Sequence, residues 1–200
     1  MISAPQLRKK QQSASVLAAL AFLILAINPP AIAQTLEERL AQCKACHGET
    51  GNSQLEKNPS IAAQPEFFLL NQLVLMREGV RKVEAMADVV KGLQDSEIQT
   101  LAAFFTKQKP ERTPETVDQE LVKKGAALSQ KMRCESCHGE SLQGETQIPR
   151  IAGQRIDYML DVMKAFRDNK REGADTNMTA AVFGASDSDL EALAHYAASR

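Results

Sequence analysis

The chain has 200 residues, of which 44% are hydrophobic and 24% are charged, and its formal net charge is −1 at pH 7. This charge excludes the broad basic surface of a nucleic-acid-binding protein. The length allows one medium domain or two small ones.

Residues 1–33 have the pattern of a secretory signal peptide. A basic start, "RKK", is followed by twelve apolar residues from Val16 to Ile27 and by the small-x-small sequence "AIA". A membrane anchor is the alternative, but a spanning helix needs about 20 apolar residues, and Asn28-Pro29-Pro30 ends this run. We expect cleavage after Ala33 and a periplasmic mature protein with no transmembrane segment. Loss of the three basic residues would leave 21 basic and 25 acidic residues, a formal charge of −4.

The first predicted helix of the mature chain leads into a cysteine motif. Thr35 and Glu38 form a Ser/Thr-x-x-Glu box, which starts helices, and the helix reaches "CKACHG" at Cys43, Cys46 and His47. Cys-x-x-Cys-His is the attachment sequence of c-type haem. Two thiols on one helical turn can form thioethers to both vinyl groups of a porphyrin, and the following histidine then lies under the iron.

Two more helices are expected before a linker. Apolar residues at helical spacing predict a middle helix over about residues 65–78. Ser96 with Gln99 is a capping pattern that predicts the start of a terminal helix. Met86 lies in the loop expected between these two helices. The segment "KQKPERTPETVD", residues 107–118, is polar, contains two prolines and can order as an extended strap.

The second half of the chain repeats the first. At a shift of about ninety residues, "PSIAAQ" at 59–64 falls on "PRIAGQ" at 149–154, and "DSEIQTLAAF" falls on "DSDLEALAHY". The matching helices are expected over about 118–132 and 155–168, and from Ser188 with Glu191. Alternating strand patterns are missing. Two copies are too few for a solenoid, so we expect two all-α lobes.

The cysteine motif is part of this repeat, because "CESCHG" begins at Cys134. In an exported protein four cysteines commonly form two disulfides, and two Cys-x-x-Cys arms can form one zinc site. A zinc site leaves the adjacent histidines unexplained, and disulfides leave the repeated His-Gly unexplained. The sequence therefore predicts two covalent c-type haems. Their expected residues are Cys43, Cys46, Cys134 and Cys137 for attachment, and His47 and His138 for the iron.

The second axial ligand is expected to be methionine, the other common ligand of c-type haem. The third histidine, His195, falls opposite Ala103 and cannot serve two sites, so we interpret it as an ordinary helix-surface residue. Met86 and Met178 coincide in the repeat and lie 39 and 40 residues after their histidines. The reserve candidates are Met76 in the first half and Met163 in the second.

The chain resembles class I di-haem cytochromes of the cytochrome c4 type over essentially all of its mature length. The matching segments are "CKACHGETGNS", "PSIAAQ", "RKVEAM", "LQDSEIQTLAAFF", "CESCHGE", "PRIAGQ", "AFRDNKREGADTNM" and "DSDLEALAHY". The resemblance implies an all-α fold of two tandem class I cytochrome c domains, each wrapped around one covalent haem. It also implies that Pro59 and Pro149 offer their carbonyls to the proximal imidazoles. The expected order is signal peptide 1–33, first domain 34–110, linker 111–118 and second domain 119–200.

The resemblance implies a periplasmic electron carrier rather than an enzyme. Iron with both histidine and methionine bound has no open position for a substrate, and a di-haem peroxidase would need one. The implied partners are redox proteins such as a membrane oxidase, a reductase or a dehydrogenase. The alternative is the cytochrome subunit of a periplasmic dehydrogenase, such as a sulfide-oxidising flavocytochrome.

Overall fold

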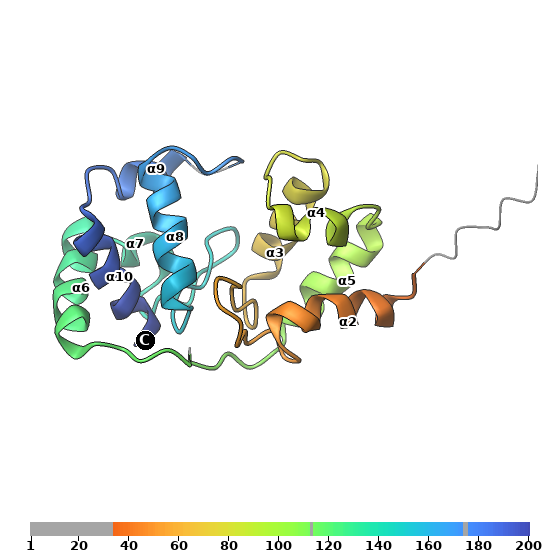
Figure 1. The fold of residues 1–200 in the computed structure, drawn as a ribbon, viewed down its shortest axis with the longest axis horizontal. Helices are drawn as coiled ribbons and strands as arrows, with labels where there is room; N and C mark the ends of the chain where they lie inside the picture. Colours follow the sequence, from red (N-terminus) through yellow and green to blue (C-terminus); the bar gives the residue numbers. More distant parts are fainter. Residues whose placement is uncertain (1–33, 113, 174–175) are drawn as a thin grey trace, which may run out of the picture. The chain divides into compact units, whose positions relative to one another are not determined.

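The structure is a computed structural model that describes residues 34–112, 114–173 and 176–200, so the predicted signal peptide lies outside the described residues. Four helices of this part form the first lobe (Figure 1). They are α2 (Leu36–His47), α3 (Glu66–Arg77), α4 (Glu84–Val90) and α5 (Asp95–Thr106).

The second lobe contains the remaining described helices. They are α6 (Gln119–Met132), α7 (Glu135–His138), α8 (Ile156–Arg167), α9 (Thr176–Ala181) and α10 (Asp187–Ala198). The described residues contain no β-strand, only one isolated bridge between Glu145 and Ile148. The all-α prediction is thus confirmed. None of the helices in the described ranges has the length and apolar character that crossing a membrane requires.

Two helices of the first lobe, α2 and α5, begin where side chains satisfy free backbone N–H groups. The predicted box at the start of α2 is confirmed: Thr35 Oγ1 accepts from the N–H of Glu38 (3.2 Å), and the Glu38 carboxylate accepts from the N–H of Thr35 (2.7 Å). The predicted capping pair of α5, Ser96 with Gln99, was wrong by two residues, because the observed pair is Gln94 with Glu97. The Glu97 carboxylate accepts from the N–H of Gln94 (2.7 Å) and places the cap earlier.

The start of the terminal helix in the second lobe differs from the prediction in the same direction. The expected start at Ser188 was wrong, because α10 begins at Asp187 with Ser186 as its N-cap. Ser186 Oγ accepts from the N–H of Asp189 (3.2 Å), and the Asp189 carboxylate accepts from the N–H of Ser186 (3.3 Å). A serine and an acidic residue three apart occur here in two overlapping registers, and the sequence pattern alone does not choose between them.

The helix that approaches the second cysteine motif is interrupted. Arg133 adopts the left-handed conformation (φ 58°, ψ 37°) and ends α6, and α7 then begins at Glu135. In the first lobe α2 continues without a break to His47. Left-handed backbone usually marks glycine, so an arginine at this position gives no sign of the break in the sequence.

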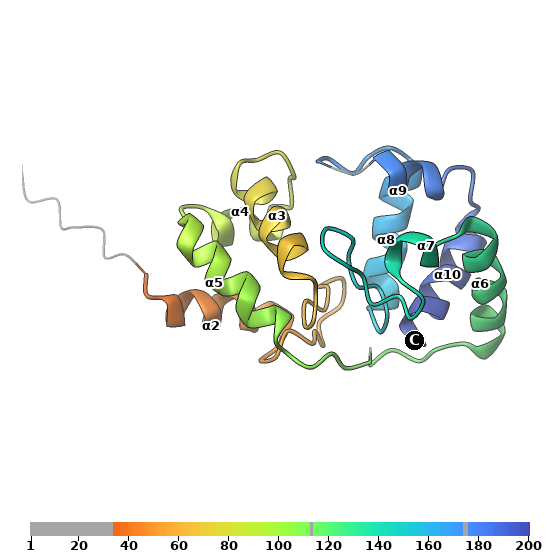
Figure 2. The same cartoon turned by 180° about the vertical axis from the view of Figure 1, so that it is seen from behind.

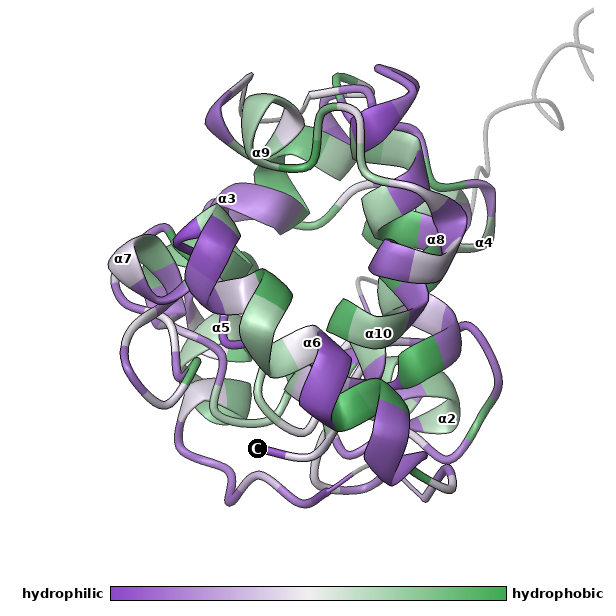
Figure 3. Ribbon diagram, turned by 90° about the vertical axis from the view of Figure 1, so that its left-hand side faces the viewer, coloured by the Kyte–Doolittle hydropathy of each residue, from purple (hydrophilic) through white to green (hydrophobic). Residues whose placement is uncertain are grey.

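The core of the second lobe is one cluster enclosed by α6, α8 and α10. Both ribbon views place α6 beside α10 (Figures 1 and 2), and α6 carries apolar and polar residues along its length (Figure 3). The helices cross at Gly125, where an added Cβ would overlap the carbonyl oxygen of Ala192. The largest buried side chains of this cluster are Leu142, Met159, Met163, Leu190, Leu193 and Tyr196.

The core of the first lobe is divided into two smaller clusters. Leu40 and Cys43 of α2 pack against both of them. Helix α2 has 12 residues including the cysteine motif, whereas α6 has 14 residues before its motif begins. The first lobe therefore has a shorter entry helix and a less continuous core than the second. The buried residues of the two clusters are Leu69, Val90, Leu93, Ile98, Leu101, Ala102 and Phe105.

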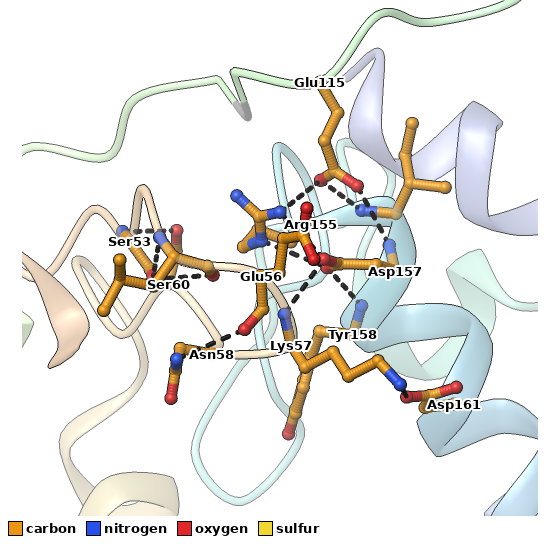
Figure 4. Close-up of polar contacts among 12 residues, drawn as sticks. Ser53, Glu56, Lys57, Asn58, Ser60, Glu115, Arg155, Asp157, Tyr158 and Asp161 are labelled. Carbon is orange, nitrogen blue, oxygen red and sulfur yellow. Dashed lines mark hydrogen bonds and ion pairs between the residues drawn. The ribbon is translucent and has the colours of Figure 1, made fainter.

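The linker between the lobes is held to both of them. On the side of the first lobe, Asn52 Oδ1 accepts from the N–H of Glu111 (2.9 Å). On the side of the second lobe, the Glu115 carboxylate accepts from the N–H groups of Ile156 (2.8 Å) and Asp157 (3.1 Å) (Figure 4). These two N–H groups lie at the start of α8, so the linker supplies the cap of a helix in the second lobe.

The two lobes belong to one compact unit, Thr35–Arg200, and Asp157 lies where they meet (Figure 4). Its carboxylate accepts from the N–H of Lys57 in the first lobe (2.9 Å) and from the Arg155 guanidinium (2.8 and 3.0 Å). Burial alone would raise the pKa of Asp157, but these bonds and the N–H of Tyr158 lower the pKa below its ordinary value. Asp157 is therefore ionised at neutral pH and joins the lobes as a carboxylate.

We expect Gly125→Leu to destabilise the second lobe, because the new side chain has no space against α10. Overpacking of this kind costs about 1–3 kcal/mol, which thermal unfolding followed by circular dichroism measures as a lower Tm. Ala127→Leu adds the same side chain on the exposed face of α6 and should change stability by less than about 0.5 kcal/mol. Equal Tm values for the two variants would show that the crossing is not tight.

We expect Asp157→Asn to lower the free energy of unfolding by about 1–3 kcal/mol at pH 7, because it weakens charged hydrogen bonds. The pKa of Asp157 is lower when folded, so its stabilising effect is present above pH ~4 and is lost as the pH falls through the folded value. Urea unfolding at pH 7, 4 and 3 should show the difference from the unmodified protein shrinking. The control Asp161→Asn, which loses an exposed ion pair with Lys57, should cost less than about 1 kcal/mol. A difference that does not depend on pH would contradict the assignment.

Candidate haem-binding sites

Each cysteine motif lies at the end of a helix that stops directly after its histidine. The residue that follows, Gly48 or Gly139, has φ 82° and ψ 159°, a combination that is essentially restricted to glycine. At Gly48 an added Cβ would overlap the carbonyl oxygen of Asn52. The glycine of the repeated His-Gly therefore has a backbone role: it lets the chain turn back beside the histidine.

The two histidine rings are buried and held in one orientation. His47 is 7% exposed and its Nδ1 lies 2.8 Å from the carbonyl oxygen of Pro59. His138 is 8% exposed and its Nδ1 lies 2.9 Å from the carbonyl oxygen of Pro149. A carbonyl can only accept, so Nδ1 carries the proton and Nε2 keeps its lone pair. In the described part of the chain Nε2 of neither ring has a hydrogen-bond partner.

The burial of these rings also sets their charge. Burial lowers the pKa of His47 and of His138, and the proline carbonyls oppose this only in part. Both imidazoles are therefore neutral at pH 7. Neutral imidazole is the form that binds metal, and the free Nε2 is the atom that would bind it.

No disulfide joins any of the four cysteines of the motifs. Cys46 and Cys137 are exposed, whereas Cys43 and Cys134 are partly buried, and burial raises the pKa of each of these two. Within the described ranges no three His, Cys, Asp or Glu side chains gather as a metal site. The two pairs of thiols lie in different lobes, at α2 and α7, so each motif forms a separate site with its own histidine.

The methionines proposed from the repeat lie on two short helices. We expected Met86 and Met178 in loops, which was wrong, because they lie on α4 and α9. Both are partly buried against the core of their own lobe. The alternative Met163 is 5% exposed inside the second core, and Met76 packs against the same cluster as Met86. Helices of six or seven residues are unstable alone, so packing on the two cores accounts for these short helices.

A cationic cavity lies where α8 and the segment after α3 come together. It has a volume of about 190 Å³. Burial, and then the positive charge of Arg171, lower the pKa of Arg81, whose Nη1 donates to Gln72 Oε1 (2.5 Å). Haem carries two propionate carboxylates, so the positive charge here fits that group. The charged residues that line the cavity are Arg81, Lys82, Lys170, Arg171 and Glu172.

Three polar residues near these sites were not found from the sequence. Gln64 and Gln154 contact the loops that carry the two prolines, and Arg81 lines the cationic cavity. The repeat does align the two glutamines, in "IAAQ" and "IAGQ", but it does not reveal what they bind. The hydrogen bond of His195 involves neither motif. Its Nδ1 accepts from the N–H of Asp118, at the end of the linker (3.0 Å).

Comparison with known proteins places the chain among cytochromes. The family model described as "Cytochrome c" matches residues 122–199. Cytochrome c4 of Azotobacter vinelandii is 32% identical over 178 residues, covering 79% of this chain and 84% of that protein. The crystal structure of reduced recombinant cytochrome c4 from Pseudomonas stutzeri superposes with a TM-score of 0.73 at 29% identity, covering 82% and 98% of the two chains. A thiosulfate dehydrogenase electron acceptor from Thiomonas intermedia is 29% identical and covers 66% of each chain.

The similarity to cytochrome c4 extends over both lobes, whereas the family model matches the second lobe. The fold is that of two class I cytochrome c domains, as predicted. The two Cys-x-x-Cys-His motifs correspond to two covalently attached c-type haems. The chain belongs to the cytochrome c4 family of di-haem electron-transfer proteins.

Proposed function

We propose that this protein carries electrons in the periplasm between redox partner proteins, through two haems with histidine and methionine as axial ligands. The observation that carries the proposal is the paired site: each lobe has a buried, neutral histidine with a free Nε2 and a methionine at the matching repeat position. The proposed attachment residues are Cys43, Cys46, Cys134 and Cys137. The proposed axial pairs are His47 with Met86 and His138 with Met178, and Pro59 and Pro149 orient the histidines.

The protein's own residues would keep the two sites closed to substrates. A thioether in the sixth position leaves no open position and raises the reduction potential relative to a second imidazole. The bound haem supplies one-electron redox chemistry. The proline carbonyls hold each imidazole in place, and the methionine helices α4 and α9 pack on their own cores. Such fixed ligands suit a carrier, because the same groups serve both oxidation states.

The same proposal includes the boundaries and the location of the mature chain. We propose a signal peptide over 1–33, cytochrome domains over 34–110 and 119–200, and a linker over 111–118. Export is supported by the basic start, the apolar run and the small-x-small site of the first 33 residues.

A specific similarity favours one class of electron donor. A relative named as the electron acceptor of thiosulfate dehydrogenase covers 66% of this chain. The second candidate function is therefore that of electron acceptor for a periplasmic dehydrogenase of sulfur compounds. It is related to the alternative from the sequence, the cytochrome subunit of a sulfide-oxidising flavocytochrome. Either role uses the same two haems and the same ligands.

The proposed attachment and cleavage are tested together by the intact mass of protein purified from a periplasmic fraction. The expected mass is that of residues 34–200 plus two covalent haems. The variant Cys43→Ala/Cys46→Ala should lose the mass of one haem, and the matched variant Cys134→Ala/Cys137→Ala should lose the other. Two covalent haems in either variant would contradict the assignment of the thiols.

The proposed axial ligand of the second lobe is tested with Met178→Ala. Removing the thioether should open one iron, so that the reduced protein binds about one carbon monoxide per chain. Met178→His should keep that iron closed and lower its potential, because imidazole replaces thioether. Visible spectra and potentiometric titration measure both effects.

The control for this experiment is Met132→Ala, which removes a partly buried methionine just before the second cysteine motif. It should leave both haems unreactive to carbon monoxide. If Met178→Ala behaves like the control, Met163 becomes the candidate ligand. The corresponding pair in the first lobe is Met86, with Met76 as the alternative.

A further inference from the structure

Two glutamines at the same repeat position bind the backbone of each other's lobe. Gln154 Oε1 accepts from the N–H of Ser60 and Gln154 Nε2 donates to the Ser60 carbonyl, both at 2.8 Å. Gln64 Oε1 accepts from the N–H of Arg150 (2.9 Å), and Gln64 Nε2 donates to the Arg150 carbonyl (2.8 Å). The two side chains are 5% and 4% exposed. Backbone N–H groups can only donate, so the orientation of each amide is fixed.

The residues that these glutamines bind directly follow the two prolines. The peptide group between Pro59 and Ser60 therefore has two partners (Ser60 is labelled in Figure 4). Its C=O accepts from His47 Nδ1 in the first lobe, and its N–H donates to Gln154 in the second. The peptide group after Pro149 is placed in the same way between His138 and Gln64. Each glutamine is thus one peptide group away from the histidine of the opposite lobe.

A peptide group transmits polarisation from one end to the other. Its nitrogen lone pair is delocalised onto the carbonyl oxygen, so an acceptor at the N–H increases the negative charge on the oxygen. Consecutive hydrogen bonds of this kind strengthen each other by perhaps ~10–30%. A stronger bond at Nδ1 raises the basicity of the imidazole that binds a metal. A more basic ligand favours oxidised iron and therefore lowers the reduction potential.

We infer that each lobe sets the reduction potential of the other through these glutamines: Gln154 acts on the haem of the first lobe and Gln64 on the haem of the second. The inference rests on the proposed role of His47 and His138 as iron ligands. The glutamines are positioning residues, because they touch neither the ligand histidine nor the haem. Contact between the lobes holds both potentials below the values that separated lobes would have.

A role in adhesion alone predicts a different result. If the amides only join the lobes, replacing either one loosens the same interface and affects both sites in similar ways. If they act through the proline peptides, the effect crosses the interface and appears in one haem. The location of the shift therefore separates the two explanations.

The experiment uses the holoprotein with the variants Gln154→Leu and Gln64→Leu. Potentiometric titration in about 0.5 M salt, where exposed charges are screened, gives both midpoint potentials. The same variants are also made in a Met178→His background, in which the step of the second lobe is displaced to lower potential and can be assigned. Gln154→Leu should raise the potential of the first lobe only, and Gln64→Leu that of the second only.

A second readout is the Nδ1 proton of each histidine in NMR spectra of the reduced protein. Its resonance should move upfield for His47 in Gln154→Leu and for His138 in Gln64→Leu, because the hydrogen bond weakens. The control Lys57→Gln breaks the exposed ion pair between the lobes, Lys57 with Asp161, without touching either proline peptide. It should move neither potential nor either Nδ1 resonance.

The outcomes distinguish this inference from the proposed ligation. Three results would overturn the crossed effect. They are equal shifts of both midpoint potentials, a shift only for the haem of the lobe that carries the substitution, and no shift of either potential. If Met178→His alone displaces neither step, the ligand assignment fails, whatever the glutamine variants do. Should a leucine variant not incorporate both haems, Gln154→Ala and Gln64→Ala remove the same bonds with less bulk, and the same crossed shifts are required of them.

Discussion

The hydrogen bond from each motif histidine to a proline carbonyl is the interaction on which both sites depend. It joins the end of a helix to a loop that lies 12 residues further on in the first lobe and 11 in the second. The bond can form only where Gly48 or Gly139 has reversed the chain. The proline loop is closed in turn by two N–H groups that donate to one carbonyl, that of Gly51 or Leu142. The polypeptide itself thus orients the nitrogen, Nε2, that is proposed to bind the iron.

The sequence predicts what short-range chemistry determines. The middle helices α3 and α8 lie within one residue of their predicted ends, and the cysteine motifs lie at helix ends as expected. The break at Arg133 was not predictable, because its left-handed backbone belongs to an arginine. The short helices around Met86 and Met178 depend on packing, since helices of six or seven residues are unstable alone.

The partners of Gln64 and Gln154 lie 86 and 94 residues away, and no local pattern encodes such a distance. Methionine ligation stays a prediction.

The two lobes have the same arrangement of histidine and proline, but they differ in the helices and the core around it. In the second lobe α6 lies against α10 at Gly125, and one continuous core surrounds the site. In the first lobe the shorter α2 reaches two separate clusters through Leu40 and Cys43. A smaller core contributes less hydrophobic stabilisation, so the first lobe depends more on its cofactor and on bonds from its neighbour. Duplication has therefore preserved the residues that hold a haem more closely than the helices that enclose it.

The anchored linker also limits how the lobes can move. Glu115 caps α8, and the linker ends at Asp118, whose N–H is bound by His195 of α10. A hinge normally has a backbone that can change its dihedral angles at little cost. A rotation between the lobes would also have to break the hydrogen bond that the Asp157 carboxylate accepts from the N–H of Lys57, a charged bond of a kind worth about 1.5–3 kcal/mol. Opening of the interface is thus a cooperative event with a threshold, and small thermal fluctuations leave the distance between the two electron-carrying sites unchanged.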